Sequence, residues 1–288
     1  MKIILITGAN GQLGKKIRDI SSEYSQYNFL FTDVEQLDIT SRKDVETFFI
    51  AKKPDAVINC AAYTNVDNAE DDFDTACLIN ETGPGLLAEY CNKYSAEFIH
   101  ISTDYVFEGN ATVPYKEIDE TNPVSAYGVS KLKGELAVTR NLKNSIIVRT
   151  SWLYSEYGKN FALTILKYAK EKEQLKVVYD QIGTPTYAGD LAKAVLDMLE
   201  PCFSHNNANI YGVYHYSNLG VCSWYDFALF LLKSENIKTP VLAVDSSEFP
   251  VKAKRPSYSV FDKTKTISKF KIKIPYWTES CREMLSKI

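Results

Sequence analysis

A threonine, a tyrosine and a lysine have the spacing of a proton-transfer site. Thr103 lies in the run Ser102-Thr103-Asp104, and Tyr127 stands four residues before Lys131. Residues at i and i+4 share one face of a helix, so the phenol and the ammonium group would lie side by side. A tyrosine alone has a pKa of about 10, and a nearby cation lowers that pKa by stabilising the phenolate. Thr103, Tyr127 and Lys131 are therefore candidate catalytic residues.

A glycine-rich turn near the N-terminus has the pattern of a dinucleotide site. The run Gly8-Ala9-Asn10-Gly11-Gln12-Leu13-Gly14 directly follows the expected strand at residues 2–7. Glycines lack a Cβ, so pyrophosphate oxygens approach the backbone N–H groups at the start of a helix. The last glycine lets that helix pack closely on the strand. The pattern predicts a nicotinamide-dinucleotide site with the turn residues Gly8, Asn10, Gly11, Gln12, Leu13 and Gly14.

Residues after the second and third expected strands would complete the cofactor site. Asp33 stands where a carboxylate binds the 2′-hydroxyl of the adenosine ribose, and it would repel a 2′-phosphate. NADH is therefore favoured, although Lys15 and Lys16 after the turn leave NADPH open as the alternative. The other cofactor candidates follow the same two strands and are Asp38, Ile39, Ala61, Ala62 and Tyr63.

The elements that must position these groups alternate between short β-branched runs and helical patterns. Strands are expected at 2–7, 28–32, 56–59, 98–102 and 145–149, and helices at 11–22, 41–52, 72–94 and 127–140. This alternation is typical of a parallel sheet covered by crossover helices. We therefore predict an α/β fold with a Rossmann-type doubly wound parallel sheet, in which ligands bind at the carboxyl ends of the strands.

The second half is expected to add a smaller lobe. Its expected elements are a helix at 160–172, a strand at 175–179, a helix at 188–199, a strand at 213–217, a helix at 224–233 and a loop-rich stretch at 238–275. Residues 1–150 would form the NAD(P)-binding domain with the catalytic residues. Residues 151–288 would form mostly a substrate-binding lobe, with segments near 175–200 and 210–222 returning to the sheet. The proline, asparagine and acidic residues of 110–123 are typical of a mobile loop.

Composition narrows the class of protein. The 288 residues are 45% hydrophobic and 24% charged, with a net charge of -3, which gives no sign of nucleic-acid binding. No apolar run approaches the roughly 20 residues of a membrane helix. The six cysteines are scattered without C-x-x-C spacing, and the three histidines are not clustered. We expect a cytoplasmic protein without a bound metal, a nucleic-acid partner or a membrane partner.

Motifs along most of the chain resemble the extended short-chain dehydrogenase/reductases. Besides the glycine turn and Tyr127-Gly128-Val129-Ser130-Lys131, the matching runs are Ala61-Ala62-Tyr63, Asn65-Val66-Asp67-Asn68-Ala69-Glu70, Ser102-Thr103-Asp104-Tyr105-Val106-Phe107, Arg149-Thr150-Ser151-Trp152-Leu153-Tyr154, Asn160-Phe161, Asp180-Gln181-Ile182-Gly183-Thr184-Pro185-Thr186 and Arg255-Pro256. The likeness is greatest to the branch that completes dTDP-L-rhamnose synthesis. Many motifs in the same order are far more specific than any one of them.

The resemblance implies that NAD(P)H reduces the 4-keto group of dTDP-4-dehydro-L-rhamnose. Tyr127 would protonate the sugar oxygen, and Lys131 would also hold the nicotinamide ribose. The residues implied for the sugar nucleotide are Thr103, Asp104, Tyr127, Trp152, Asn160, Gln181 and Arg255. Trp152 would pack flat on the deoxysugar, and an arginine such as Arg255 suits a pyrophosphate because its guanidinium binds two oxygens at once.

One departure from the family concerns a metal. Some members are described as magnesium-linked dimers that use glutamates near the cofactor turn, near Pro185-Thr186 and near the C-terminus. In this sequence the first two places hold Lys16 and Gly189. The departure argues against a metal bridge and leaves a monomer and a homodimer both open.

Related enzymes of the same fold offer alternative functions. The 4,6-dehydratases carry an Asp-Glu pair after the threonine, whereas here Tyr105 follows Asp104. The missing glutamate favours simple reduction over elimination of water, and the 4-epimerases usually lack the Asp-Tyr-Val-Phe run. The alternatives kept are a 4-ketoreductase of another deoxysugar nucleotide and a non-catalytic regulatory subunit. The presence of Thr103, Tyr127 and Lys131 together argues against the regulatory subunit.

Overall fold

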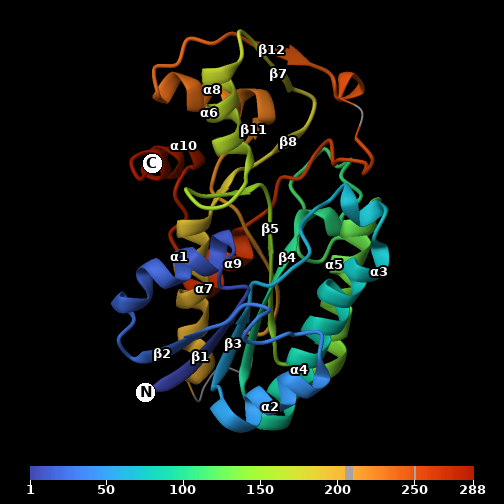
Figure 1. The fold of residues 1–288 in the computed structure, drawn as a ribbon, viewed down its shortest axis with the longest axis vertical. Coiled ribbons are helices and arrows are strands. Elements are labelled where there is room, and N and C mark those ends of the chain that lie inside the picture. Colours follow the sequence, from blue (N-terminus) through green and yellow to red (C-terminus); the bar gives the residue numbers. More distant parts are fainter. Residues whose placement is uncertain (205–209, 250) are drawn as a thin grey trace.

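A six-stranded parallel sheet forms the centre of the molecule (Figure 1). The computed structural model describes residues 1–204, 210–249 and 251–288. The strands in spatial order are β10 (Gly212–Tyr216), β5 (Ile146–Thr150), β4 (Glu97–Thr103), β3 (Ala56–Asn59), β1 (Lys2–Thr7) and β2 (Tyr27–Phe31). The chain leaves β1 for β2 on one side and passes to β3 on the other, so the order reverses at β1. The predicted Rossmann-type fold is confirmed.

Helices cover both faces of this sheet. On one face lie α1 (Gln12–Ile20) and α7 (Ala188–Leu199), and on the other lie α2 (Arg42–Lys52), α4 (Gly83–Tyr94) and α5 (Ala126–Asn141). Side chains alternate along β1, because successive residues of a strand point to opposite faces. Ile4 and Ile6 pack with Val195 of α7, whereas Leu5 packs with Leu87 of α4. The strands are thus buried on both sides, as continuous apolar runs predict.

The single helix predicted at 72–94 is interrupted. It consists of α3 (Phe73–Cys77), a π-helical segment (Leu78–Thr82) and α4. Pro84 lacks the N–H group that would bond the carbonyl of Asn80 in a regular α-helix. That carbonyl instead faces α5, where a Cβ on Gly134 would lie only 2.0 Å from the Asn80 oxygen. The interruption therefore lets α5 approach closely.

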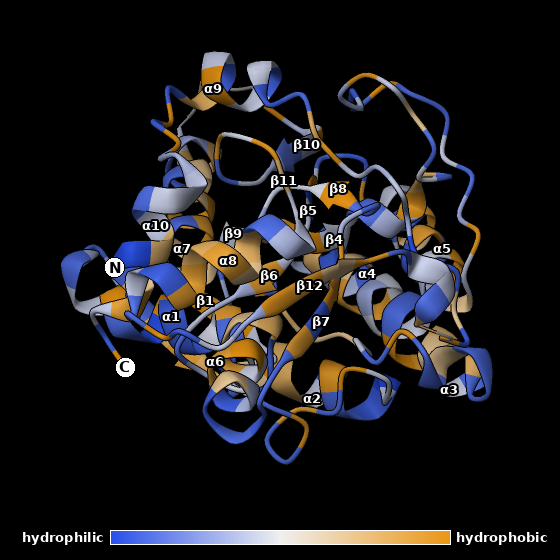
Figure 2. Cartoon of the chain, turned by 90° about the horizontal axis from the view of Figure 1, so that it is seen from above, coloured by the Kyte–Doolittle hydropathy of each residue, from blue (hydrophilic) through white to orange (hydrophobic). Residues whose placement is uncertain are grey.

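The remaining elements gather at the end of the molecule opposite the N-terminus (Figure 1). Its helices are α6 (Phe161–Glu171), α8 (Trp224–Ser234) and α10 (Trp277–Leu285). Its strands pair as β7 (Leu175–Val178) with β12 (Val241–Val244), β6 (Leu153–Tyr154) with β9 (Thr186–Tyr187), and β8 (Ile182–Gly183) with β11 (Cys222–Ser223). The hydrophobic stretches of β7, β12 and α8 are visible in Figure 2, and they contribute to a second core around Phe227 and Met284.

Several segments differ from the sequence prediction. The stretch 238–275 holds β12 and α9 (Thr264–Phe270), which are too short to give a clear periodicity. In the segment 175–200, α7 lies on the large sheet, but β7 pairs with β12 in a separate sheet.

The short helical turns are Ser21–Glu23, Asn68–Glu70, Asp104–Val106, Glu200–Phe203 and Ser246–Glu248. Among the described helices, none combines the length and the apolar character needed to cross a bilayer.

The segment 110–123 is anchored through Tyr115. The Tyr115 ring stacks on Phe107 with 4.2 Å between centroids, and the Tyr115 hydroxyl accepts the backbone N–H groups of Gly109, Asn110 and Ala111. Its own backbone pairs with Val260 and Asp262. The first part of this segment is therefore held in place, in contrast to the mobile loop that its composition indicates.

Candidate active site

A cleft of about 710 Å³ opens at the carboxyl ends of β1, β3, β4 and β5. It brings most of the predicted site residues together. The predicted cofactor residues that line it are Gly8, Asn10, Gly11, Gln12, Leu13, Gly14, Asp33, Asp38, Ile39, Ala61 and Ala62. The predicted catalytic and substrate residues that line it are Thr103, Asp104, Tyr127, Lys131, Trp152 and Asn160. Tyr63, Gln181 and Arg255 do not line this cleft.

The glycine turn has the shape of an anion cradle. Gly8 has a φ of +61°, and a Cβ there would lie 2.6 Å from the backbone N of Ala61. A Cβ on Gly14 would lie 2.5 Å from Cα of Ala9, so glycine is required at both places. Gly11 caps α1 without a side-chain acceptor. The first N–H groups of α1 therefore remain available to a pyrophosphate, and the turn fits the predicted dinucleotide.

Asp33 is held in the wall of the cleft by backbone contacts. Its carboxylate accepts the backbone N–H of Asn10 at 3.0 Å and that of Val34 at 2.9 Å. The two lysines expected to offset its charge are engaged elsewhere. Lys16 forms ion pairs with acidic side chains, and Lys15 lies over the Tyr157 ring. Asp33 thus meets no compensating cation from this pair.

Tyr127 and Thr103 lie together in the floor of the cleft. Tyr127 is buried, and its burial raises the pKa of the phenol, while the Thr103 hydroxyl acts against that rise. The predicted lowering of the Tyr127 pKa by Lys131 is wrong for this structure. The reason is that the Lys131 ammonium turns away and donates to the carbonyl of Ile101 at 2.7 Å. Tyr127 therefore stays protonated at neutral pH, which is the state needed for an acid.

Lys131 loses its proton more readily than an ordinary lysine. Burial lowers the pKa of Lys131 to about 8, although Glu135 and Cys60 act in the opposite direction. The group is charged below that pH and neutral above it. Lys131 is therefore a residue of the cleft whose charge changes within the working range of most enzymes.

We predict that kcat/KM falls as the pH rises through about 8, because Lys131 becomes neutral there. The measurement is initial rate at limiting substrate across the pH range. Lys263 supplies a matched control, since burial also lowers its pKa to about 8 but it lies outside the cleft. Lys263→Met should keep the same alkaline limb. A limb that vanishes in that variant would assign the titration to Lys263.

Asp104 presents an unpaired carboxylate oxygen. Its Oδ1 accepts the Thr103 hydroxyl at 2.9 Å, whereas its buried Oδ2 has no hydrogen-bond partner among the described residues. Burial raises the pKa of Asp104 to about 6. A buried acceptor without a partner costs free energy unless a ligand satisfies it. The geometry thus suits a hydroxyl group of a bound ligand.

A buried ion pair lies behind the candidate catalytic residues. Arg149 of β5 donates to Glu135 of α5 through Nε at 2.9 Å and Nη2 at 2.7 Å. Ser102, next to Thr103, donates to the same carboxylate at 2.5 Å. These contacts join α5, which carries Tyr127 and Lys131, to two strands of the sheet. The candidate catalytic side chains are therefore held by a network that single-residue motifs did not reveal.

Trp152 is fixed at the rim of the cleft. It has a φ of +47°, an unusual value for a bulky residue, and its indole stacks on Trp224 with 3.5 Å between centroids. A Cβ on Gly183 would lie 2.5 Å from the Trp152 ring. Because Trp224 covers one face of the indole, a sugar would have to pack on the other face.

Three predicted substrate residues have protein partners. Asn160 caps α6 by accepting the N–H of Leu163, and its amide donates to Gln12 at 3.0 Å. Gln181 donates to Ser246 at 2.9 Å, away from the cleft. Arg255 pairs with Asp67 at 2.5 Å and donates to the Tyr105 hydroxyl at 3.2 Å. Arg255 thus reaches the site only through Tyr105.

Several residues that line the cleft were not singled out from the sequence, and Tyr105 and Lys159 are the ones used below. Tyr105 lines the cleft and contacts Tyr127 edge-on, with 5.4 Å between ring centroids. Lys159 lines the cleft from the far side. Tyr105 follows the candidate Thr103-Asp104 pair, so its place in the chain could have marked it as a residue of the site. No local pattern marks Lys159, because it comes from a loop of the second half.

Comparison with known proteins identifies close relatives. A family model described as "RmlD substrate binding domain" matches residues 1–288. The Bacillus subtilis "Spore coat polysaccharide biosynthesis protein SpsK" is 40% identical over 288 residues, covering 100% of this chain and 98% of that protein. A crystal structure of a dTDP-4-dehydrorhamnose reductase from Clostridium acetobutylicum is similar at 43% identity and a TM-score of 0.93, covering 99% of both chains. The Bacillus anthracis dTDP-4-dehydrorhamnose reductase in complex with NADP is similar at 38% identity and a TM-score of 0.94, covering 100% of both chains.

Proposed function

Because this chain belongs to the RmlD substrate binding domain family, we propose that it reduces the 4-keto group of dTDP-4-dehydro-L-rhamnose with NAD(P)H. The product would be dTDP-L-rhamnose, a precursor of cell-surface polysaccharide. Two solved relatives bear the name dTDP-4-dehydrorhamnose reductase, and one of them holds NADP. The chain is thus an oxidoreductase of the dTDP-4-dehydrorhamnose reductase type.

The observation that carries the proposal is the shared cleft of the glycine turn and the Thr103, Tyr127 and Lys131 group. A bound nicotinamide cofactor supplies a hydride to the keto carbon. Tyr127 donates its proton to the sugar oxygen as negative charge develops there. Lys131 holds the nicotinamide ribose. Thr103 turns its hydroxyl from Asp104 to the same sugar oxygen.

The other residues predicted to bind the substrate remain part of the proposal, although Gln181 and Arg255 do not line the cleft. Asp104 offers its free Oδ2 to a sugar hydroxyl, and Trp152 offers one indole face. Asn160 lines the cleft, while its side chain is bonded to α6 and to Gln12. Arg255 and Gln181 require movement of their segments before they touch the nucleotide end.

The preference for NADH over NADPH rests on Asp33. Its carboxylate lines the cleft, and Lys15 and Lys16 are engaged elsewhere, so a 2′-phosphate would meet uncompensated negative charge. The Bacillus anthracis relative nevertheless holds NADP. We propose that both cofactors serve and that NADH is somewhat favoured.

In this proposal the two halves of the chain bind different ligands. Residues 1–150 bind the cofactor and carry the catalytic residues, and residues 151–288 mostly bind the sugar nucleotide, with β10 belonging to the large sheet. All six cysteines are free, in keeping with a reducing compartment such as the cytoplasm. The oligomeric state proposed is a monomer or a homodimer that needs no metal.

A direct assay tests the function. The substrate is generated in situ, and NADH and NADPH absorbance are followed separately after the protein is added. We expect oxidation of at least one cofactor, faster with NADH. No oxidation of either would contradict the function. The same assay with UDP- and GDP-linked 4-keto sugars tests the alternative, a reductase of another deoxysugar nucleotide. NADH binding without any turnover would favour the regulatory subunit.

A further inference from the structure

The cleft has few positively charged side chains to bind the two anionic ligands proposed above. A dinucleotide and a sugar nucleotide each bring a pyrophosphate. Among the described residues that line the cleft, the carboxylates are Asp33, Asp38 and Asp104, while the only cations are Lys131 and Lys159. Lys131 lies buried against the carbonyl of Ile101. Lys159 is thus the one lining cation that is not committed to the catalytic group.

Lys159 lies in the loop that joins β6 to α6. It is exposed, and it has no hydrogen bond or ion pair with any described residue. The preceding Gly158 has a φ of +67°, and a Cβ there would lie 3.6 Å from Cγ of Gln12. Gln12 is the first residue of α1, the helix whose N-terminus would hold the dinucleotide pyrophosphate. The loop therefore faces the pyrophosphate position from the opposite wall.

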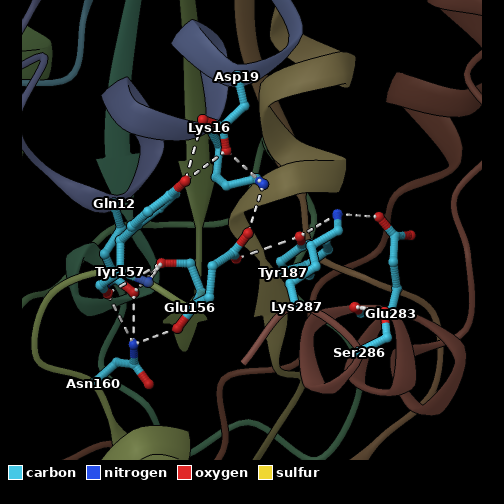
Figure 3. Close-up of polar contacts among 11 residues, drawn as sticks. Gln12, Lys16, Asp19, Glu156, Tyr157, Asn160, Tyr187, Glu283, Ser286 and Lys287 are labelled. Atoms are coloured by element: carbon cyan, nitrogen blue, oxygen red, sulfur yellow. Dashed lines mark hydrogen bonds and ion pairs between the residues drawn. The ribbon is translucent and has the colours of Figure 1, made fainter.

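The side chain of Gln12, in the glycine turn, holds this loop in place (Figure 3). The Gln12 Oε1 accepts the Ser155 hydroxyl and the Asn160 amide, each at 3.0 Å. These two partners stand on either side of Lys159 and Gly158 in the chain. The loop is therefore hydrogen-bonded to Gln12 on both sides of Lys159.

A buried ion pair fastens the same loop one turn further along α1. Lys16 is 3% exposed, and its ammonium contacts Glu156 at 2.8 Å and Asp19 at 2.9 Å. Glu156 also accepts the Tyr187 hydroxyl at 3.4 Å, and Figure 3 shows these groups converging between α1 and the loop. A charge-assisted contact of this kind is short and directional. Lys16 thus acts on the loop, and not on the ligand.

We propose that Lys159 binds the pyrophosphate of the dinucleotide cofactor and that Lys16 is a positioning residue that holds its loop against the glycine turn. The proposal rests on the function proposed above, because it needs a dinucleotide in the cleft. The cofactor pyrophosphate would then lie between the N-terminus of α1 and the Lys159 ammonium. The sugar-nucleotide pyrophosphate would lie further from the turn and would not contact Lys159.

The test measures cofactor binding without any sugar. Fluorescence titration with NADPH and with NADH gives Kd for wild type, Lys159→Met, Lys159→Arg and Lys15→Met. We expect Kd to rise about tenfold in Lys159→Met, which corresponds to about 1.4 kcal/mol, and to recover largely in Lys159→Arg. Lys15→Met is the matched control, because Lys15 follows the same turn but lies over Tyr157 outside the cleft. Its Kd should stay near that of wild type.

A second pair of variants tests the positioning role. Lys16→Met and Glu156→Gln should both raise Kd for the cofactor, and combining either with Lys159→Met should add little further loss. Their kcat at saturating cofactor should stay close to wild type, which a general loss of structure would not allow. Full additivity with Lys159→Met would overturn the positioning role.

The outcomes separate this proposal from the function itself. An unchanged Kd in Lys159→Met overturns it, as does a loss confined to the KM for the sugar nucleotide. A wild-type protein that binds NADPH tightly through Lys159 but reduces no 4-keto sugar would contradict only the proposed reaction. A wild-type protein that binds neither dinucleotide would overturn both.

Discussion

Replacing Tyr127 by phenylalanine is expected to lower kcat by about 10²- to 10⁴-fold, because the reaction then lacks its proton donor. The burial that raises the pKa of Tyr127 keeps its hydroxyl protonated at neutral pH, so the group is ready to donate. Cofactor affinity should change only within a few-fold, since the hydroxyl acts mainly in the transition state. Single-turnover rates with saturating NADH and a separate fluorescence titration measure the two effects.

Tyr105→Phe is the matched control for this variant. Tyr105 lies against Tyr127 in the same cleft, but its hydroxyl bonds to Arg255. Its loss should change kcat far less than the loss of the Tyr127 hydroxyl. If Tyr127→Phe instead abolishes cofactor binding and leaves the chemical step intact, Tyr127 has a structural role and the catalytic assignment fails.

Replacing Glu135 by glutamine is expected to lower the free energy of unfolding by about 3–5 kcal/mol, the usual cost of breaking a buried ion pair from one side. Both partners of the Glu135–Arg149 pair have side chains that are only 5% exposed. The change leaves the Arg149 charge buried without a carboxylate, and Nη1 of Arg149 already has no hydrogen-bond partner among the described residues. Urea denaturation followed by circular dichroism measures the loss.

Glu89→Gln is the matched control for burial. Glu89 also binds an arginine through both oxygens, but its pair with Arg42 is exposed to solvent. Water screens such a pair, so its loss should shift the urea midpoint very little. Equal shifts in the two variants would mean that burial does not set the strength of the Glu135–Arg149 pair.

The local patterns of the first half were sufficient to predict its fold. The five strands expected in the first half correspond to β1–β5, and the glycine turn stands between β1 and α1 as its spacing requires. The second half was harder, because β7 and β12 are four residues each and pair across a long stretch of chain. Such pairing depends on tertiary packing, which no local periodicity reports.

Residue types of the site and their order along the chain follow from the sequence alone. Gly8 and Gly14 admit no side chain, and Tyr127 and Lys131 lie one helical turn apart wherever the helix goes. How these groups act depends on the tertiary structure. Burial raises the pKa of Tyr127 and keeps its hydroxyl protonated, because desolvation depends on what packs around a group. The fold also places the Lys131 ammonium against a backbone carbonyl. Folding also brings Lys159 close to the glycine turn, although the two lie far apart in the sequence.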